Sequence, residues 1–205
     1  MIRSGAMAST APKRATYADV LAAPANAVAQ VAHGVLYTHP RPAGPHAAAA
    51  SVLGMDLGGA FHRGRGGPGG WIILDEPELH LVPARPPVGD VDVLVPDLAG
   101  WRRERMPAVP DAPYFTLPPD WVCEVLSRST AALDRSEKME IYAAAGVEHA
   151  WLVDPAARTR EAYRRQDLAW LRLGTWHDDA RVRVPPFDAI ELELGALWPA
   201  QSENL

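Results

Sequence analysis

Hydrophobic positions recur at two different spacings along this chain, and the spacing changes near residue 70. Between residues 46 and 61, apolar side chains recur at the i, i+3, i+4 spacing of one helix face: Ala49, Val52, Leu53, Leu57 and Ala60. This spacing predicts a helix of about four turns. After the glycine-rich loop 64–70, short runs rich in Val, Leu, Ile and Trp take over, a composition that is typical of buried strands.

Five of these runs are bounded by Gly, Pro and Asp, and they predict the strands of a central sheet: 71–74, 79–82, 91–95, 121–126 and 150–153. The segment 133–145 has helical spacing, and Gly146 stands where a left-handed C-cap would end the helix. Because this helix lies between the last two strands, the order predicts a parallel pair joined by a right-handed crossover.

The segments on either side of this centre predict smaller elements. Thr16 can cap a short helix that ends before Pro24, and residues 29–37 alternate around Gly34 as a hairpin would. A proline-rich link, 40–45, joins the hairpin to the long helix. Four later runs predict further strands, as a peripheral antiparallel extension: 158–163, 170–173, 181–184 and 190–194. The predicted fold class is therefore α/β, with a central mixed sheet flanked by helices and extra C-terminal antiparallel strands.

Length and composition limit the classes of protein that this chain can be. Its 205 residues, 48% of them hydrophobic, suit one substantial core, so we expect one domain over 15–199 with tails at 1–14 and 200–205. A net charge of −5 argues against a nucleic-acid coat protein, although local basic patches can coexist with an acidic total. The single cysteine, Cys123, fits a reducing cytoplasm, and no apolar run approaches the roughly 18 residues of a membrane span.

Lysine is rare in this chain: there are two, beside eighteen arginines. One of them, Lys138, lies on the predicted helix 133–145 and shares a stripe with Asp134, Ile141 and Tyr142. This stripe is the one that packs toward the sheet. A compact ammonium kept at this position suggests a task that a planar guanidinium performs poorly.

Two carboxylates occupy positions that are unusual for their charge. Glu124 is the only charged residue in the run 121–126, so it must be protonated, paired or metal-bound, or lie at an open strand end, because an unpaired buried carboxylate costs at least a few kcal/mol. Asp97 follows Pro96 at the end of another run, where a strand meets its loop. Together with Lys138, these residues could hold a divalent metal and position a water.

The order of these residues resembles a known family. The segments Val-Pro-Asp97, Trp-Val-Cys-Glu124-Val-Leu-Ser, Asp134-Arg-Ser-Glu-Lys138 and Trp-Leu-Val-Asp154-Pro are similar to the Uma family of "putative restriction endonucleases", in the PD-(D/E)XK nuclease superfamily, over about residues 16–198. The superfamily motif would place a lysine at Leu126, but the Uma family moves it to the following helix, which makes Lys138 its equivalent.

This resemblance implies a restriction-endonuclease-like core and metal-dependent hydrolysis of DNA. Asp97 and Glu124 would bind Mg²⁺ or Mn²⁺ with the Val125 carbonyl, and Lys138 would assist water activation. Three residues are candidate auxiliary groups: Gln30, where relatives often carry glutamate, Glu78 and Asp134. A homodimer is expected because duplex cleavage needs two cuts. No nucleotide cofactor is expected, because no Lys-Ser/Thr pair follows the glycine-rich loop 64–70.

Each candidate also has an ordinary structural interpretation. Asp97 could cap a turn, Glu124 could be half of a buried ion pair, and Lys138 could be the i+4 partner of Asp134. Phosphate contact and a solvated loop are equally good interpretations of Arg102, Arg103 and Arg105. His46 and His149 could border a pocket, although surface or core roles are favoured.

Two rival functions follow from these alternatives. A catalytically inactive DNA- or protein-interaction module would keep the fold without binding metal tightly. A two-carboxylate glycosidase could use Asp97 and Glu124, but it offers no role for Lys138.

Overall fold

The centre of the protein is a six-stranded mixed sheet. The computed structural model describes residues 13–41, 44–84 and 91–198, and most of the two predicted tails lies outside these ranges. The sheet has the order β10-β9-β8-β7-β6-β3. Its strands are β3 (Trp71–Asp75), β6 (Leu98–Arg102), β7 (Trp121–Val125), β8 (His149–Asp154), β9 (Thr159–Gln166) and β10 (Ala169–His177). The β7–β8 pair is parallel and the others are antiparallel, which confirms the predicted mixed sheet.

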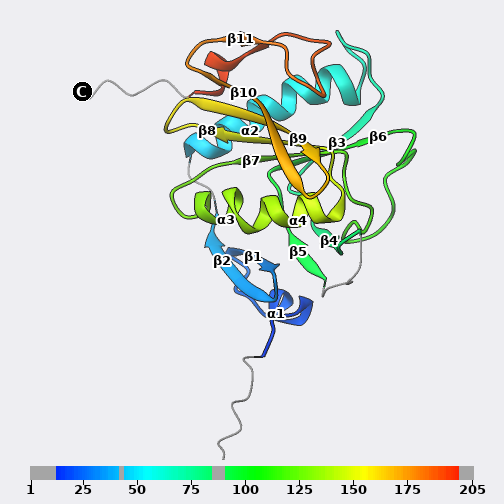
Figure 1. The fold of residues 1–205 in the computed structure, drawn as a ribbon, viewed down its shortest axis with the longest axis vertical. Helices are drawn as coiled ribbons and strands as arrows, with labels where there is room; N and C mark the ends of the chain where they lie inside the picture. Colours follow the sequence, from blue (N-terminus) through cyan, green and yellow to red (C-terminus); the bar gives the residue numbers. More distant parts are fainter. Residues whose placement is uncertain (1–12, 42–43, 85–90, 199–205) are drawn as a thin grey trace, which may run out of the picture.

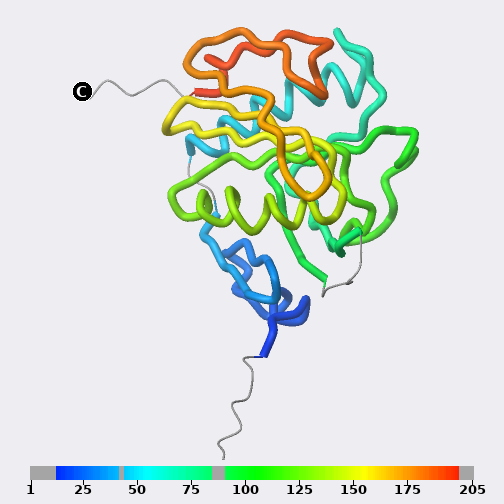
Figure 2. Tube along the Cα trace, viewed as in Figure 1, coloured from blue at the N-terminus to red at the C-terminus, as the bar shows by residue number. Residues whose placement is uncertain are grey.

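A second, four-stranded antiparallel sheet lies beside the first, in the order β2-β1-β5-β4. Its strands are β1 (Ala27–Ala32), β2 (Val35–Pro40), β4 (Leu79–Leu81) and β5 (Asp92–Leu94). The predicted hairpin is β1–β2, which turns at His33 and Gly34. The prediction that β4 and β5 belong to the central sheet was wrong, because strand composition does not specify the pairing partner. Figure 2 shows this N-terminal part, in blue, at the opposite end of the molecule from the C-terminal segment, in red.

Helices cover both faces of the six-stranded sheet (Figure 1). The helices are α1 (Tyr17–Leu21), α2 (Gly44–Leu57), its π-helical continuation η1 (Gly58–His62), α3 (Ala131–Arg135), α4 (Glu137–Ala145) and the 3₁₀ helix η2 (Leu194–Leu197). The long helix α2 packs on one face, together with η2 and the small two-stranded sheet of β11 (Arg181–Val182) and β12 (Leu192–Glu193). The pair α3–α4 packs on the other face. None of the helices in the described ranges is long and apolar enough to cross a membrane.

The predicted helix 133–145 is divided in two. Ser136 separates α3 from α4, because its φ of −114° and ψ of −94° lie outside the helical region. Gly146 ends α4 with a φ of 94°, as the sequence predicts. The break does not remove Asp134 from the sheet-facing stripe, since both Asp134 and Lys138 remain buried.

Side chains of β7 alternate between two hydrophobic cores. Trp121, Cys123 and Val125 enter the core under α2, whereas Val122 enters the core under α4. Glu124 shares the face of Val122 and is 2% exposed. The strand therefore directs one buried carboxylate toward the helix that carries Lys138.

Arg160, on β9, is a buried cation without a hydrogen-bond acceptor in the described part of the chain. It is 0% exposed, and its guanidinium carbon lies 3.3 Å from the ring centroid of Trp151 and 6.0 Å from that of Trp176. Burial lowers the pKa of Arg160 to about 9. Stacking on Trp151 offsets part of the cost of the buried charge, and the aliphatic stem fills space in the core.

We expect Arg160→Met, which keeps the stem and removes the charge, to raise the free energy of unfolding by about 1–4 kcal/mol. Arg160→Ala also removes the charge but leaves a cavity, so it should lower the free energy by about 2–5 kcal/mol. Urea denaturation measures both. If Arg160→Met and Arg160→Ala lowered the free energy of unfolding equally, the guanidinium itself would stabilise the core.

Candidate active site

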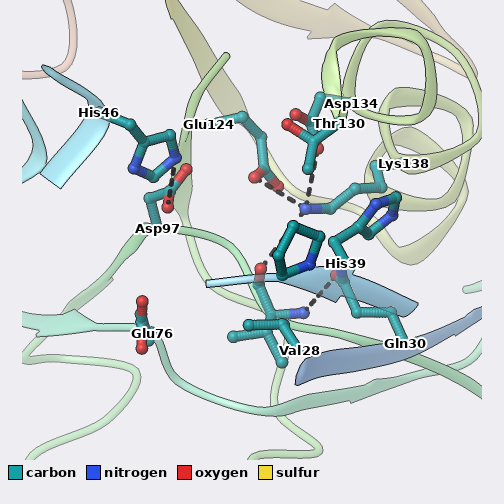
Figure 3. Close-up of a pocket in the computed structure, with 12 residues that line it drawn as sticks. Val28, Gln30, His39, His46, Glu76, Asp97, Glu124, Thr130, Asp134 and Lys138 are labelled. Carbon is teal, nitrogen blue, oxygen red and sulfur yellow. Dashed lines mark hydrogen bonds and ion pairs between the residues drawn. The ribbon is translucent and has the colours of Figure 1, made fainter. Parts of the chain in front are cut away.

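The predicted catalytic residues meet in one pocket between the two sheets and the helices α2 and α3–α4 (Figure 3). The pocket has a volume of about 50 Å³, enough for an ion and a water. It is lined by Val28, Gln30, His39, Pro40, His46, Glu76, Val95, Asp97, Glu124, Thr130, Asp134 and Lys138. Sequence reasoning selected Asp97, Glu124, Lys138, Gln30 and Asp134, and the structure brings all five together.

Lys138 lies at the centre of this group. Its Nζ atom is 2.7 Å from Glu124 Oε2 and 3.1 Å from Asp134 Oδ1, and it donates a hydrogen bond of 3.4 Å to the Val95 carbonyl. The side chain is 2% exposed. The ammonium therefore links α4 to α3, to β7 and to the end of β5.

The second oxygen of Glu124, Oε1, accepts a hydrogen bond of 2.5 Å from the Tyr142 hydroxyl. Burial raises the pKa of Glu124 to about 8, and the charge of Lys138 opposes this shift. Burial also disfavours the charge of Lys138, but Glu124 and Asp134 outweigh this effect and raise the pKa of Lys138. Lys138 therefore stays protonated at neutral pH. Tyr142 was placed on the same stripe by its spacing, but its bond to Glu124 was not foreseen.

Asp97 is anchored by donors from two other elements. Its Oδ2 accepts a hydrogen bond of 2.6 Å from the Val125 N–H, and its Oδ1 lies 3.1 Å from His46 Nε2. His46 belongs to the first turn of α2, so the start of that helix is directed at the carboxylate. Burial lowers the pKa of His46, but the hydrogen bond and the charge of Asp97 outweigh burial and raise it. The bond to Val125 holds Asp97 beside Glu124.

Gln30 holds the backbone that leads into Asp97. Its Oε1 accepts a hydrogen bond of 2.8 Å from the Val95 N–H, while the Val95 carbonyl faces Lys138. Both backbone polar groups of Val95, its N–H and its carbonyl, are thus held by hydrogen bonds. Gln30 therefore helps to fix the position of the backbone that precedes Asp97.

Two short links between the sheets run side by side at the pocket. Residues 76–78 connect β3 to β4, and residues 95–97 connect β5 to β6. The Glu76 N–H donates a hydrogen bond of 3.0 Å to the Asp97 carbonyl, so the links are joined by their backbones. Each link thus contributes one acid to the pocket lining.

Glu78, one of the candidate auxiliary groups, does not line the pocket. Its Oε1 lies 2.8 Å from His80 Nε2, and Glu76 lines the pocket instead. Glu76 has a positive φ of 45°, which marks a turn between β3 and β4. Strand parity cannot be counted across such a turn, because the alternation of side chains restarts after it.

The arginine candidates do not reach the pocket. The strand β6 begins beside Asp97 and ends at Arg102, about 16 Å away at 3.3 Å per residue. Arg102 stacks 4.8 Å from the Trp71 ring centroid, Arg103 donates to the His62 carbonyl at 3.2 Å, and Arg105 pairs with Asp120 at 2.8 Å. A role for these arginines at the scissile bond is therefore not supported by their position.

The strand β6 itself was missing from the predicted elements. Its Leu-Ala-Gly-Trp-Arg sequence includes Ala and Gly, which are uncommon in strands. At Gly100, a Cβ atom would lie 3.2 Å from the Trp121 ring and 3.3 Å from the Trp71 ring. The two flanking indoles therefore favour glycine there, because a Cβ atom would have to displace them slightly, a constraint that local propensity does not reveal.

Four other polar residues of the pocket were not selected as site residues from the sequence: His39, His46, Glu76 and Thr130. For His46, the available signal was its place in the first turn of the helix after the link 40–45. His149, considered together with His46, does not line the pocket and lies 3.5 Å from Glu148 instead.

The sequence matches the model of the Uma2 family, described as "putative restriction endonuclease", over residues 16–195. The chain belongs to the Uma2 family. A similar solved structure is that of a "putative nuclease belonging to DUF820" from Anabaena variabilis, with 24% identity and a TM-score of 0.66. The match covers 87% of the Uma2 chain and 94% of the other chain. No curated protein shows significant similarity to the chain.

These comparisons confirm the predicted family and the nuclease-like α/β fold. Family and fold together support a nuclease. The roles of individual pocket residues in the Uma2 protein remain predictions.

The raised pKa of Glu124 predicts a pH dependence of stability in the Uma2 protein. Between about pH 4.5 and 8, the folded protein keeps a proton on Glu124 that the unfolded chain has lost. The resulting stabilisation is complete below about pH 4.5 and is lost as the pH rises toward 8. Relative to Glu124→Gln, whose amide does not titrate, the wild type should lose at most about 5 kcal/mol over this window, at 1.36 kcal/mol per pKa unit.

Urea unfolding at about pH 5, 6.5 and 8 measures this difference. Glu104→Gln, at an exposed position away from the pocket, is the matched control and should follow the wild type. Parallel pH curves for the wild type and Glu124→Gln would contradict the prediction.

Proposed function

We propose that this Uma2 protein is a metal-dependent endonuclease that hydrolyses phosphodiester bonds of DNA. In this proposal, Asp97 and Glu124 bind Mg²⁺ or Mn²⁺ together with the Val125 carbonyl, and Lys138 assists the attacking water. One observation carries the proposal: the bond from the Val125 N–H to Asp97 sets the two carboxylates side by side, next to a buried ammonium. Family and fold support the same reaction class.

The chemistry of the donors fits a hard divalent cation. Carboxylate and carbonyl oxygens are the ligands that Mg²⁺ prefers, and Glu76 and Asp134 add negative charge to the pocket lining. To bind a metal, Glu124 would have to give up a contact with the protein, because one of its oxygens pairs with Lys138 and the other accepts a hydrogen bond from Tyr142. Within the described ranges, no three His, Cys, Asp or Glu side chains form a ready-made metal cluster. Metal binding would therefore compete with Lys138 for Glu124.

A divalent ion bound here would lower the pKa of a water and offset the charge that builds on the phosphate. The chain's own residues would arrange the reactants. His46 and Val125 hold Asp97 in one orientation, and Gln30 holds the backbone before it. These contacts limit the reorganisation needed when the phosphodiester enters, which favours the transition state.

Lys138 would act as a fixed positive charge. Its raised pKa keeps the ammonium protonated, so it cannot serve as a general base at neutral pH. An ammonium released from Glu124 can instead donate a hydrogen bond to the attacking water and so orient it, or stabilise the negative oxygens of the phosphate. The neighbouring Asp134 would keep the ammonium in place during this exchange.

The second candidate is a catalytically inactive DNA- or protein-interaction module. One observation favours it: all four oxygens of Asp97 and Glu124 already face donors from the protein. In that case Lys138 would be the permanent counter-ion of Glu124. The two candidates predict opposite responses to Mg²⁺ and to the loss of Lys138.

Calorimetry with Mg²⁺ and Mn²⁺ tests the metal site. We expect binding heat from the wild type and a loss of it in Asp97→Asn, which removes the charge and keeps the shape of the side chain. A wild type that releases no heat with either metal and cuts no DNA would favour the inactive module.

Cleavage of supercoiled DNA tests the role of Lys138. We expect Lys138→Met to lower the cleavage rate by about 10²–10³-fold, the usual effect of removing one transition-state donor. Lys13→Met is the matched control, because Lys13 is the other lysine of the chain and is strongly exposed outside the pocket. Undiminished cleavage by a folded Lys138→Met protein would make Lys138 purely structural.

A further inference from the structure

Two arginine-bearing segments that are far apart in the sequence lie side by side. The backbone N–H of Arg103 donates to the Gly70 carbonyl at 2.9 Å, and its guanidinium donates to the His62 carbonyl at 3.2 Å. Arg102 pairs with Trp71 across β3 and β6 and stacks on its ring. These contacts join the loop that follows η1 to the end of β6. They gather five arginines into one region: Arg63, Arg65, Arg102, Arg103 and Arg105.

Most of these charges have no carboxylate nearby. Arg105 forms an ion pair with Asp120, but the other four arginines have no carboxylate oxygen within 4.0 Å among the described residues. Elsewhere in the molecule, Arg135, Arg158 and Arg181 each pair with a carboxylate at 2.6 or 2.7 Å. The region therefore carries a local excess of positive charge in a chain of net charge −5.

The glycine-rich loop holds its arginines in a defined shape. Its backbone donates from Arg65 to the Gly59 carbonyl at 2.9 Å and from Gly69 to the Ala60 carbonyl at 3.0 Å. At Gly67 the loop packs so closely that a Cβ would lie 2.7 Å from the Ala60 Cβ. Arg63 and Arg65 are exposed on this packed loop. Because the loop is already held in place, its ordering would cost little conformational entropy when a ligand binds.

This region lies at the opposite end of α2 from the pocket. His46 is in the first turn of α2, and the helix with η1 continues to His62, about 24 Å away at 1.5 Å per residue. The strand β6 separates Arg102 from Asp97 by about 16 Å, in agreement with this separation. The arginines therefore cannot act on a bond held in the pocket.

We propose that Arg63, Arg65, Arg102 and Arg103 form a second nucleic-acid surface, which binds the phosphate backbone of duplex DNA independently of the pocket. Guanidinium groups bind phosphate oxygens through paired, charge-assisted hydrogen bonds. Gly64, between Arg63 and Arg65, has no side chain, so the backbone of a duplex can approach closely there. Contacts of this kind add affinity and carry no sequence information.

DNA binding in EDTA tests this proposal, because it requires no cleavage. We expect fluorescence anisotropy with a short labelled duplex to show binding by the wild type that weakens between about 50 and 200 mM salt. The double variant Arg63→Ala/Arg65→Ala should bind about tenfold more weakly, with a salt slope smaller by about 1.8, from 0.9 per lost phosphate contact. The variant Arg63→Lys/Arg65→Lys keeps the charges and should retain most of the salt slope.

The matched control is Arg158→Ala/Arg172→Ala, which removes the same charge from the β8–β9 turn and β10. This control should bind like the wild type. The proposal is overturned if the wild type does not bind, if both double alanine variants bind alike, or if polyglutamate competes as well as unlabelled DNA. Polyglutamate competition would point to an acidic protein partner. A wild type that binds through these arginines but never cleaves DNA would refute the proposed nuclease activity alone.

Discussion

The buried ion pair between Lys138 and Glu124 is the interaction on which the rest of the site depends. It crosses from α4 to β7, and the same ammonium reaches α3 and the end of β5. Removing Lys138 would take the shared cation from two buried carboxyl groups, Glu124 and Asp134, at a cost of about 3–5 kcal/mol. The pair therefore constrains both the packing of the helices on the sheet and the charge of the pocket. The residue that we propose assists the attacking water is therefore also a structural contact between helix and sheet, and a metal-binding measurement is needed to separate the two roles.

The elements that were predicted well are those whose signal is local. The spacing of apolar residues in α2, the C-cap at Gly146 and the order of strand, helix and strand around α4 all act within short stretches of chain. The pairing of β4 and β5 with the N-terminal hairpin depends on residues far away in the sequence. The same is true of β6, whose Gly100 is favoured by two tryptophans from neighbouring strands. These features become visible only after the chain has folded.

The residues of the site likewise divide into those that local sequence patterns predict and those whose positions depend on the folded chain. Alternation along β7 and the helical stripe placed Glu124 and Lys138 correctly on facing surfaces, and the strand end after Pro96 added Asp97 to them. His46 reaches Asp97 only because of the path of the chain through the link before α2, and sequence spacing does not encode that path. The arginine triplet after Trp101 was ambiguous for a similar reason. Its position at the far end of β6 separates it from the chemistry and joins it to the glycine-rich loop.

The paired links 76–78 and 95–97 place the pocket on the line where the two sheets join. Glu76 and Asp97 sit on this line, joined by one backbone hydrogen bond, while Glu124 belongs wholly to the larger sheet. The relative placement of the two sheets therefore helps to set where these acids lie around the pocket. Four lining residues, Val28, Gln30, His39 and Pro40, belong to the N-terminal hairpin, so the way in which the smaller sheet docks on the larger one fixes one wall of the pocket.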